Sequence, residues 1–176
     1  RLFCGQPMLV WSIHAAQKAG CFQRIIVSTD DPQIAGLAQA HGAEIPFVRP
    51  AYLADDYAGT RDVLVHAIEC LEAEGCSLHA VCCLYATAPF VLPEDLLKAR
   101  DLMLASRPDT VVFAATSFPF PIQRAIRLDQ EGYASAINPH DAEQRSQDLE
   151  EAFHDAGQFY WATPSAWRQR GNLFDG

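Results

Sequence analysis

The chain has 176 residues, which is enough for one domain with a sizeable core, and its hydrophobic content of 49% is ordinary for a globular protein. A net charge of −9 argues against a surface for nucleic acid or an anionic membrane, because both need clustered cations. No apolar run approaches the roughly 18 residues of a membrane span, and no secretory signal opens the chain. We therefore expect a cytoplasmic protein that binds neither nucleic acid nor membranes.

The first two thirds of the chain predict helices alternating with strands. Gly20 ends the first helix, and Thr60 is expected to cap the third. The run 79–85 is nearly continuously apolar, as in a central parallel strand that is covered on both faces. This alternation predicts an α/β domain with a mostly parallel sheet. In chain order we expect helix 8–19, strand 24–29, helix 30–41, strand 43–48, helix 60–75, strand 79–85, helix 93–106 and strand 109–116.

From about Ser117 the predicted segments shorten to 124–128, 133–137 and 157–162. We interpret 118–162 as an antiparallel excursion from the main sheet. Phe118, Phe120 and the aromatic residues 159–161 would leave a large exposed apolar patch, so we expect this excursion to form a homodimer.

Six cysteines are present, and none has the C-x2-C spacing of a zinc site. The neighbours Cys82 and Cys83 should point to opposite faces of a strand. We interpret all six as buried, reduced thiols rather than metal ligands.

The segment 145–161 combines a single arginine, a histidine–aspartate pair and an aromatic strand. Arg145 offers a planar fork for a carboxylate, and His154 titrates near neutral pH. Tyr160 belongs to an apolar wall that can still form hydrogen bonds. These groups suit a small anionic organic ligand, although an edge strand with a charged turn explains the segment equally well.

Two loops precede predicted helices and are candidates for nucleotide binding. Ser28 and Asp30 follow a predicted strand, where open α/β sheets bind ligands, although Asp30 or Asp31 could simply cap the next helix. Arg49 and Thr60 flank a long loop and could reach the base or ribose. Alternatively, Arg49 braces this loop by pairing with an aspartate, at position 55 or 56.

Two further loops are candidates for sugar binding. Tyr85 and Thr87 follow the central apolar strand, and the alternative there is a tight strand-to-helix turn. Gln123 and Arg124 end a proline-rich stretch, which could equally be a rigid loop without a ligand. The chain contains no glycine-rich phosphate cradle, so the phosphate loop of a nucleotide-binding protein would lie outside these 176 residues.

Taken together, these stretches resemble the nucleotidyltransferases that activate nine-carbon sugar acids with CTP, the CMP-sialic acid synthetase family. Residues 82–85, 145–149 and 154–157 resemble the pseudaminate branch more than the sialate branch. The main matching stretches, in order, are 5–8 (Gly-Gln-Pro-Met), 28–31 (Ser-Thr-Asp-Asp), 49–56 (Arg-Pro-Ala-Tyr-Leu-Ala-Asp-Asp) and 85–89 (Tyr-Ala-Thr-Ala-Pro).

The resemblance implies a Rossmann-like nucleotide-diphospho-sugar transferase fold and transfer of CMP from CTP to a nonulosonic acid, with release of pyrophosphate and with Mg²⁺ as cofactor. It implies that Arg49 and Thr60 contact the cytosine nucleotide, and that Tyr85 lies at the sugar. Arg145 and Tyr160 would line the sugar-acid pocket.

Two family features are absent from the 176 residues: the basic N-terminal loop and the late metal-binding aspartates. No residue is therefore assigned to triphosphate, to metal or to a catalytic step. The alternatives are the same reaction on sialic acid, legionaminic acid or the eight-carbon acid Kdo, or a non-catalytic nucleotide-binding domain.

Overall fold

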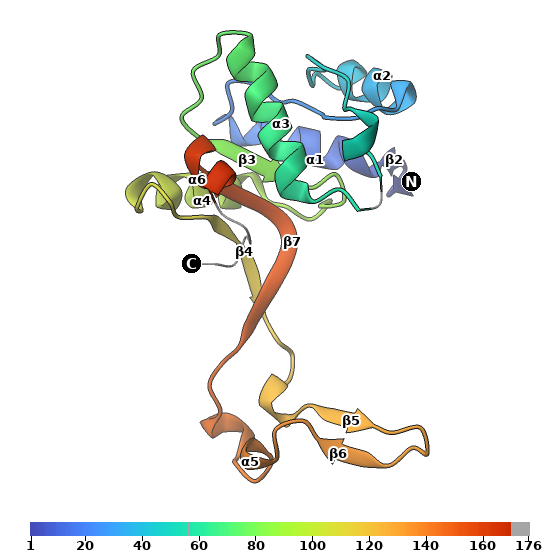
Figure 1. The fold of residues 1–176 in the computed structure, drawn as a ribbon, viewed down its shortest axis with the longest axis vertical. Coiled ribbons are helices and arrows are strands. Elements are labelled where there is room, and N and C mark those ends of the chain that lie inside the picture. Colours follow the sequence, from blue (N-terminus) through green and yellow to red (C-terminus); the bar gives the residue numbers. More distant parts are fainter. Residues whose placement is uncertain (56, 170–176) are drawn as a thin grey trace. The chain divides into compact units, whose positions relative to one another are not determined.

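The computed structural model describes residues 1–55 and 57–169, and the chain separates into two compact units. The large unit comprises Arg1–Ala114 and Gly157–Gly176, and the small unit comprises Ala115–Ala156. Figure 1 shows the elements of both along the chain, and each unit is described by itself below.

The large unit contains most of the helical structure. Its strands are β1 (Leu2–Phe3), β2 (Gln6–Pro7), β3 (Val81–Leu84), the first half of β4 (Val112–Ser117) and the C-terminal half of β7 (Phe153–Ala162). Its helices are α1 (Met8–Ala19), α2 (Pro32–Ala40), the 3₁₀ turn η1 (Ala51–Leu53), α3 (Thr60–Ala73), α4 (Pro93–Ala105) and α6 (Pro164–Gln169).

The predicted helices are confirmed, and their ends follow the expected local chemistry. Gly20 ends α1 in the left-handed conformation, with φ of 63°, which costs glycine little. Asp31, rather than Asp30, caps α2, because its carboxylate accepts hydrogen bonds from the N–H groups of Gln33 and Ile34. The prediction that Thr60 caps α3 is wrong, because Gly59 occupies the cap position and Thr60 is the first helical residue.

The main sheet has the strand order β3-β7-β4. β3 pairs with β7 in antiparallel register, from Val81 opposite Ala162 to Leu84 opposite Phe159. The predicted strand at 79–85 is confirmed, as β3. The predicted mostly parallel sheet is not confirmed, because β3 pairs with β7 in antiparallel orientation. β4 is less buried than expected, since its last three residues are exposed.

The predicted strands 24–29 and 43–48 are not formed as strands among the described residues. They are extended and meet in a single parallel bridge between Ile26 and Glu44. Two hydrogen bonds support the bridge: Val27 N–H donates to the Glu44 carbonyl at 3.0 Å, and Glu44 N–H donates to the Ile25 carbonyl at 2.8 Å. Two such bonds are too few to make a regular ladder.

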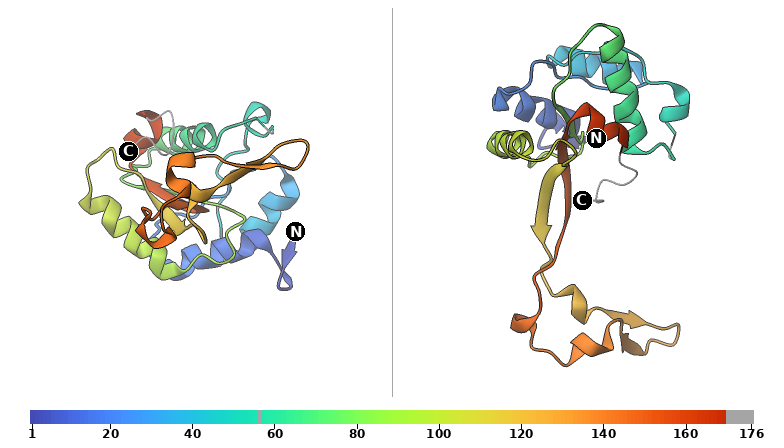
Figure 2. Two further views of the ribbon diagram at one scale, coloured as in Figure 1. Left: turned by 90° about the horizontal axis from the view of Figure 1, so that it is seen from below. Right: turned by 60° about the vertical axis from the view of Figure 1, so that its left-hand side comes forward.

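Helices cover the sheet on both faces, and Figure 2 shows α1 beside α4 and α3 beside α6. One apolar cluster includes Leu96 of α4 together with Phe159 and Trp161 of β7. A second cluster includes Ile68 of α3, Tyr160 of β7 and Trp167 of α6. Successive residues of β7 therefore enter opposite clusters, as the alternation of a strand requires.

The cysteines follow the same alternation. Cys82 packs against the first cluster and Cys83 belongs to the second, which confirms that they point to opposite faces. All six cysteines are free, but the expectation that all are buried is wrong: Cys83 is buried, Cys4 is exposed, and the other four are half-buried.

The small unit is built around an antiparallel hairpin of β5 (Ile126–Leu128) and β6 (Ala134–Ala136), whose register places Arg127 opposite Ser135. It also contains two 3₁₀ turns, η2 (Ile122–Arg124) and η3 (Ser146–Asp148), and the short helix α5 (Pro139–Ala142). The antiparallel character predicted for the second half is thus confirmed. In the described part of the chain, no helix has both the length and the apolar character needed to cross a membrane.

Candidate functional site

Three of the predicted site residues meet where β3 ends in the large unit. The hydroxyl groups of Thr60, at the start of α3, and Tyr85 lie 3.2 Å apart. The ring of Tyr85 lies 5.5 Å from the ring of Tyr160 on β7. Thr60, Tyr85 and Tyr160 therefore form one polar and aromatic group, which we call the Tyr85 group.

The backbone around Tyr85 is held from several sides. Its N–H donates to the Gln158 carbonyl at 2.9 Å, which extends the pairing of β3 and β7 by one step. Its carbonyl accepts hydrogen bonds from the Ser12 hydroxyl, at 2.8 Å, and from the Ala88 N–H, at 3.2 Å. A carbonyl with both lone pairs used holds its loop in a defined position. The turn that follows carries Thr87 exposed to solvent.

Tyr160 does not form an open wall. It is 1% exposed and packs in the second cluster, with the ring of Phe113 at 5.9 Å. Phe159 and Trp161 are buried as well, so the expected exposed aromatic patch at 159–161 does not exist. Tyr160 can support Tyr85 from behind, whereas Tyr85 itself is only half-buried.

Arg49 and Ser28 form a second predicted pair in the large unit. The guanidinium of Arg49 donates to the Ser28 hydroxyl, at 3.1 Å, and to the Ser28 carbonyl. The Arg49 N–H also donates to the Thr29 carbonyl at 3.0 Å. Arg49 therefore ties its loop to the end of the extended segment 24–29. Of the two aspartates considered as its partner, Asp55 instead accepts the N–H groups of residues 57 and 58, and Asp56 lies outside the described residues. Asp30 is exposed, and no hydrogen bond or ion pair joins its carboxylate to Arg49 among the described residues.

The small unit holds the other four predicted residues. Gln123 donates to the Glu150 carbonyl at 2.8 Å, and its Oε1 is buried without a hydrogen-bond partner in the described chain. Arg124 donates at 2.8 Å to the hydroxyl of Ser146, the residue that follows Arg145. These contacts brace 3₁₀ turn η2 against the segment 146–150.

Arg145 and His154 are both exposed. Among the described residues, Arg145 makes no ion pair, although acidic residues flank it in sequence. His154 lies with its ring 4.7 Å from that of Phe118, and its Nδ1 is 2.9 Å from the Asp155 carbonyl. The guanidinium of Arg145 is thus accessible to a solute anion.

The adjacent thiols of β3, Cys82 and Cys83, are uncharged at neutral pH. Burial raises the pKa of Cys83 to about 12, and burial raises the pKa of Cys82 well above its ordinary value. Both groups stay protonated at neutral pH, and metals bind thiolates. Within residues 1–55 and 57–169, no three side chains of His, Cys, Asp or Glu are grouped so that they could hold a metal ion.

Two residues with structural roles at the site were not predicted. Ser12 is 3% exposed on an otherwise apolar helix face, and a buried serine needs a hydrogen-bond partner, which here is Tyr85. Arg61 follows Thr60 and donates to the backbone carbonyls of Trp167 and Arg168, which fixes α6 against α3. Nothing in the local sequence of Arg61 signals this distant contact. Arg61 also lines an open cavity of about 380 Å³. None of the predicted site residues lines this cavity.

Comparison with known proteins shows which family this chain belongs to. A model of the family described as cytidylyltransferase matches residues 1–159. Pseudaminic acid cytidylyltransferases of two Campylobacter jejuni strains are 40% identical over 172 residues, which is 98% of this chain and 74% of each relative. The CMP-N,N'-diacetyllegionaminic acid synthase of Legionella pneumophila is 35% identical over 105 residues, 58% of this chain and 44% of that protein.

A solved structure of CMP:2-keto-3-deoxy-manno-octonic acid synthetase complexed with CTP is similar with a TM-score of 0.61, covering 96% of this chain and 68% of that one. At 16% sequence identity this likeness shows the fold alone, an α/β nucleotidyltransferase fold. The family match over most of the chain, and 40% identity to two characterised relatives over nearly all of it, show that this chain belongs to the cytidylyltransferase family.

Proposed function

We propose that this protein transfers CMP from CTP to the nonulosonic acid pseudaminic acid. The anomeric hydroxyl of the sugar acid attacks the α-phosphorus of CTP and loses its proton, and the bond from that phosphorus to the leaving pyrophosphate breaks. The observation that carries the proposal is the 40% identity to pseudaminic acid cytidylyltransferases over 98% of the chain. Similarity to the legionaminic acid synthase covers only 58%, so legionaminic acid ranks second.

The geometry of the large unit is consistent with positioning a nucleotide and a sugar side by side. We assign Arg49 and Thr60 to the nucleotide and Tyr85 to the sugar, and the Thr60–Tyr85 hydroxyl contact at 3.2 Å links the two roles. We also assign Ser28 and Asp30 to the nucleotide, and Thr87, which is exposed, to the sugar. Positioning two reactants in this way lowers the entropic cost of bringing them together.

In the small unit we assign Arg145, Gln123, Arg124 and His154 to the sugar acid. Arg145 is the natural partner of the carboxylate, because its guanidinium is exposed and has no ion-pair partner among the described residues. Mg²⁺ is part of the proposal for the whole protein, although no residue of the described chain is assigned to it. The six free thiols support a reducing, cytoplasmic location.

The proposed reaction is tested by pyrophosphate release from purified full-length protein. We expect release with CTP and pseudaminic acid, and slower or no release with sialic acid, legionaminic acid or Kdo. Excess chelator should abolish the activity and added Mg²⁺ should restore it. Faster turnover of legionaminic acid would change the proposed substrate from pseudaminic acid to legionaminic acid. No pyrophosphate release with any of the acids would favour a non-catalytic nucleotide-binding domain.

The Tyr85 group is tested by removing one hydroxyl at a time. Tyr85→Phe keeps the ring packing on Tyr160, so we expect kcat/KM for the sugar acid to fall about two- to tenfold, the effect of one neutral hydrogen bond. Thr60→Val should reduce kcat/KM for CTP by a similar factor. The exposed Tyr52→Phe serves as the control, with no change in either constant. Equal losses for both substrates in both variants would mean that the hydroxyl pair only braces the loop.

Arg145→Ala is expected to weaken use of the sugar acid about ten- to hundredfold and to leave the KM for CTP unchanged. A charge-assisted contact to a carboxylate contributes roughly 1.5–3 kcal/mol, whereas a surface ion pair contributes about 0–1 kcal/mol. Steady-state kinetics with each substrate varied in turn measure this. The control is Arg127→Ala, an exposed arginine on β5. An unchanged KM for the sugar acid, with a lowered melting temperature, would assign Arg145 to the scaffold.

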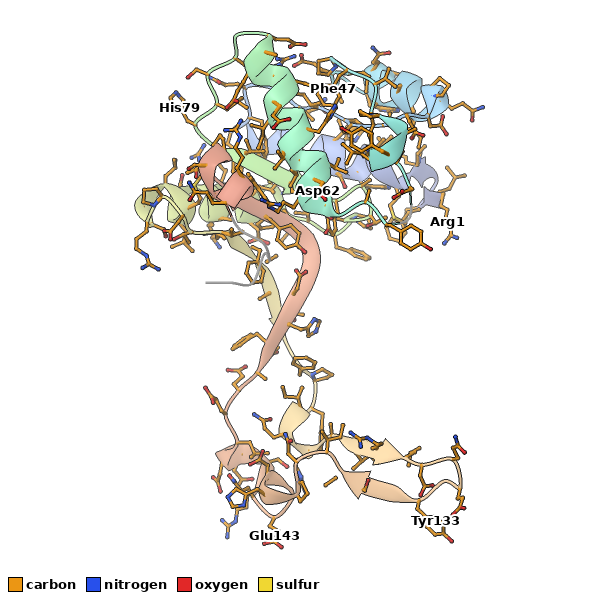
Figure 3. The ribbon with its side chains drawn as sticks, viewed as in Figure 1. Arg1, Phe47, Asp62, His79, Tyr133 and Glu143 are labelled. Atoms are coloured by element: carbon orange, nitrogen blue, oxygen red, sulfur yellow. The ribbon has the colours of Figure 1, made fainter. Side chains whose placement is uncertain are left out.

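We also propose that the protein is a homodimer through the small unit. The buried 159–161 aromatics do not contribute to this surface, but several large apolar residues of the unit remain exposed, including Tyr133 near the hairpin turn (Figure 3). They are Phe118, Phe120, Ile122, Ile126, Leu128, Tyr133, Ile137 and Phe153. An exposed apolar surface of this kind marks an interaction site. Light scattering should give the mass of a dimer at micromolar concentration, and Leu128→Glu should give a monomer. A monomeric wild-type protein would contradict the proposal.

A further inference from the structure

The turn that follows β3 is anchored in the large unit at both of its ends and is exposed between them. At its start, the Ser12 hydroxyl of α1 donates to the Tyr85 carbonyl at 2.8 Å. At its end, Ala88 is 3% exposed and belongs to the first apolar cluster, which also includes residues of α1. The two residues between these anchors, Ala86 and Thr87, are exposed to solvent. We call these two residues the tip of the turn.

Hydrogen bonds give this segment two successive turns. The Ala88 N–H donates to the Tyr85 carbonyl at 3.2 Å, and the Val91 N–H donates to the Ala88 carbonyl at 3.3 Å. Each bond joins residues three positions apart, as in a β-turn, and Pro89 occupies the position in the second turn that proline favours. The tip therefore belongs to a short, internally bonded segment, and its direction is set by the peptide that leads into it.

The hydrogen bond from Ser12 acts on that peptide and not on the side chain of Tyr85. The N–H of Tyr85 is held by the Gln158 carbonyl at 2.9 Å, and its ring lies 5.5 Å from the ring of Tyr160. The remaining freedom is rotation about the bond from Cα to the carbonyl carbon, which turns the carbonyl and everything after it. Because Ser12 binds this carbonyl, it restricts that rotation. Ser12 thus controls the direction of the tip, whereas β7 controls the Tyr85 ring.

The identity of residue 12 fits this role better than a packing role. Ser12 is 3% exposed, and its neighbours on the buried side of α1 are apolar, among them Val10, Ile13 and Ala16. Alanine forms helices more readily than serine, and a helical serine often bonds to a carbonyl of the preceding turn. The Ser12 hydroxyl instead bonds to a carbonyl 73 positions later in the chain. Alanine would serve packing alone at least as well, so the hydroxyl matters through its contact with Tyr85.

We propose that Ser12 is a positioning residue for the sugar acid: by fixing the peptide after Tyr85, it directs Thr87 toward the substrate. This inference rests on the proposed function, in which Thr87 contacts the sugar. Ser12 itself is buried, so it acts through the turn. In Ser12→Ala the Tyr85 carbonyl keeps its hydrogen bond from the Ala88 N–H and is not left unpaired, so the fold should remain intact. The tip would lose its fixed direction.

Steady-state kinetics on the full-length protein test this role. Ser12→Ala should raise the KM for the sugar acid about two- to tenfold, the effect of one neutral hydrogen bond, and leave the KM for CTP unchanged. The matched control is Ser106→Ala at the end of α4, because the Ser106 hydroxyl also donates to a backbone carbonyl, that of Leu102 at 2.7 Å. This control should change neither KM. Equal effects of the two substitutions on the KM for the sugar acid would overturn the inference.

Double-mutant cycles identify the residue through which Ser12 acts. Thr87→Val removes the hydroxyl at the tip, and we expect Ser12→Ala to add no further loss in this background. Tyr85→Phe changes only the end of the ring, so the loss caused by Ser12→Ala should persist in full in that background. Independent losses with Thr87→Val, or a loss that disappears with Tyr85→Phe, would contradict the proposal. An unchanged KM for the sugar acid in Thr87→Val would contradict it as well.

Amide hydrogen exchange, followed by NMR, gives a readout that needs no turnover. In Ser12→Ala the Ala88 amide should exchange about two- to tenfold faster than in the wild-type protein, because the turn that it closes opens more often. The Tyr85 amide, which is bonded to Gln158, should keep its rate. An unchanged rate at Ala88 would show that Ser12 does not hold the turn. No pyrophosphate release by the wild-type protein would instead contradict the proposed function and the substrate role of Ser12 with it, and the exchange rates alone would then decide whether Ser12 sets the turn.

Discussion

The pairing of β3 with β7 is the interaction on which the rest of the large unit depends. It joins residues that are about 80 positions apart in the sequence, with Val81 opposite Ala162 and Leu84 opposite Phe159. Because side chains alternate along β7, one strand supplies Trp161 to one apolar cluster and Tyr160 to the other. The same ladder continues to Tyr85, so it also sets the position of the residue that links the proposed nucleotide and sugar sides.

The helices could be predicted from the sequence because their signals are local. The left-handed Gly20 after α1 and the Asp31 cap of α2 each lie within a few residues of the helix that they end or begin. Thr60 shows the limit of such signals. A threonine before an amphipathic helix suggests a helix cap. The hydroxyl of Thr60 instead contacts Tyr85 from the first turn of α3. That contact depends on the position of β3, which begins 21 residues later in the chain.

The strands were harder to predict because a strand exists only through its partner. Segments 24–29 and 43–48 have strand-forming sequences, yet they share only a single bridge, between Ile26 and Glu44. The sequence predicts an exposed ligand wall at the aromatic run 159–161, whereas the sheet buries this run between helices. The partner of Arg49 is Ser28, 21 residues earlier, rather than the nearby Asp55. Proximity in sequence is thus a poor guide to the partners of charged loop residues in an α/β fold.

The adjacent cysteines of β3 have a consequence for the chemical durability of the protein. The thiolate, not the thiol, attacks peroxide and electrophiles, and burial raises the pKa of Cys83 to about 12, so this group stays protonated at neutral pH. Burial of Cys83 in the second cluster therefore slows its oxidation in two ways, by limiting access and by suppressing the reactive thiolate. A sulfenic or sulfinic acid at this position would force a polar oxygen between packed rings. The sulfur atom of Cys83 can thus lie in the core without making it a target of oxidative damage.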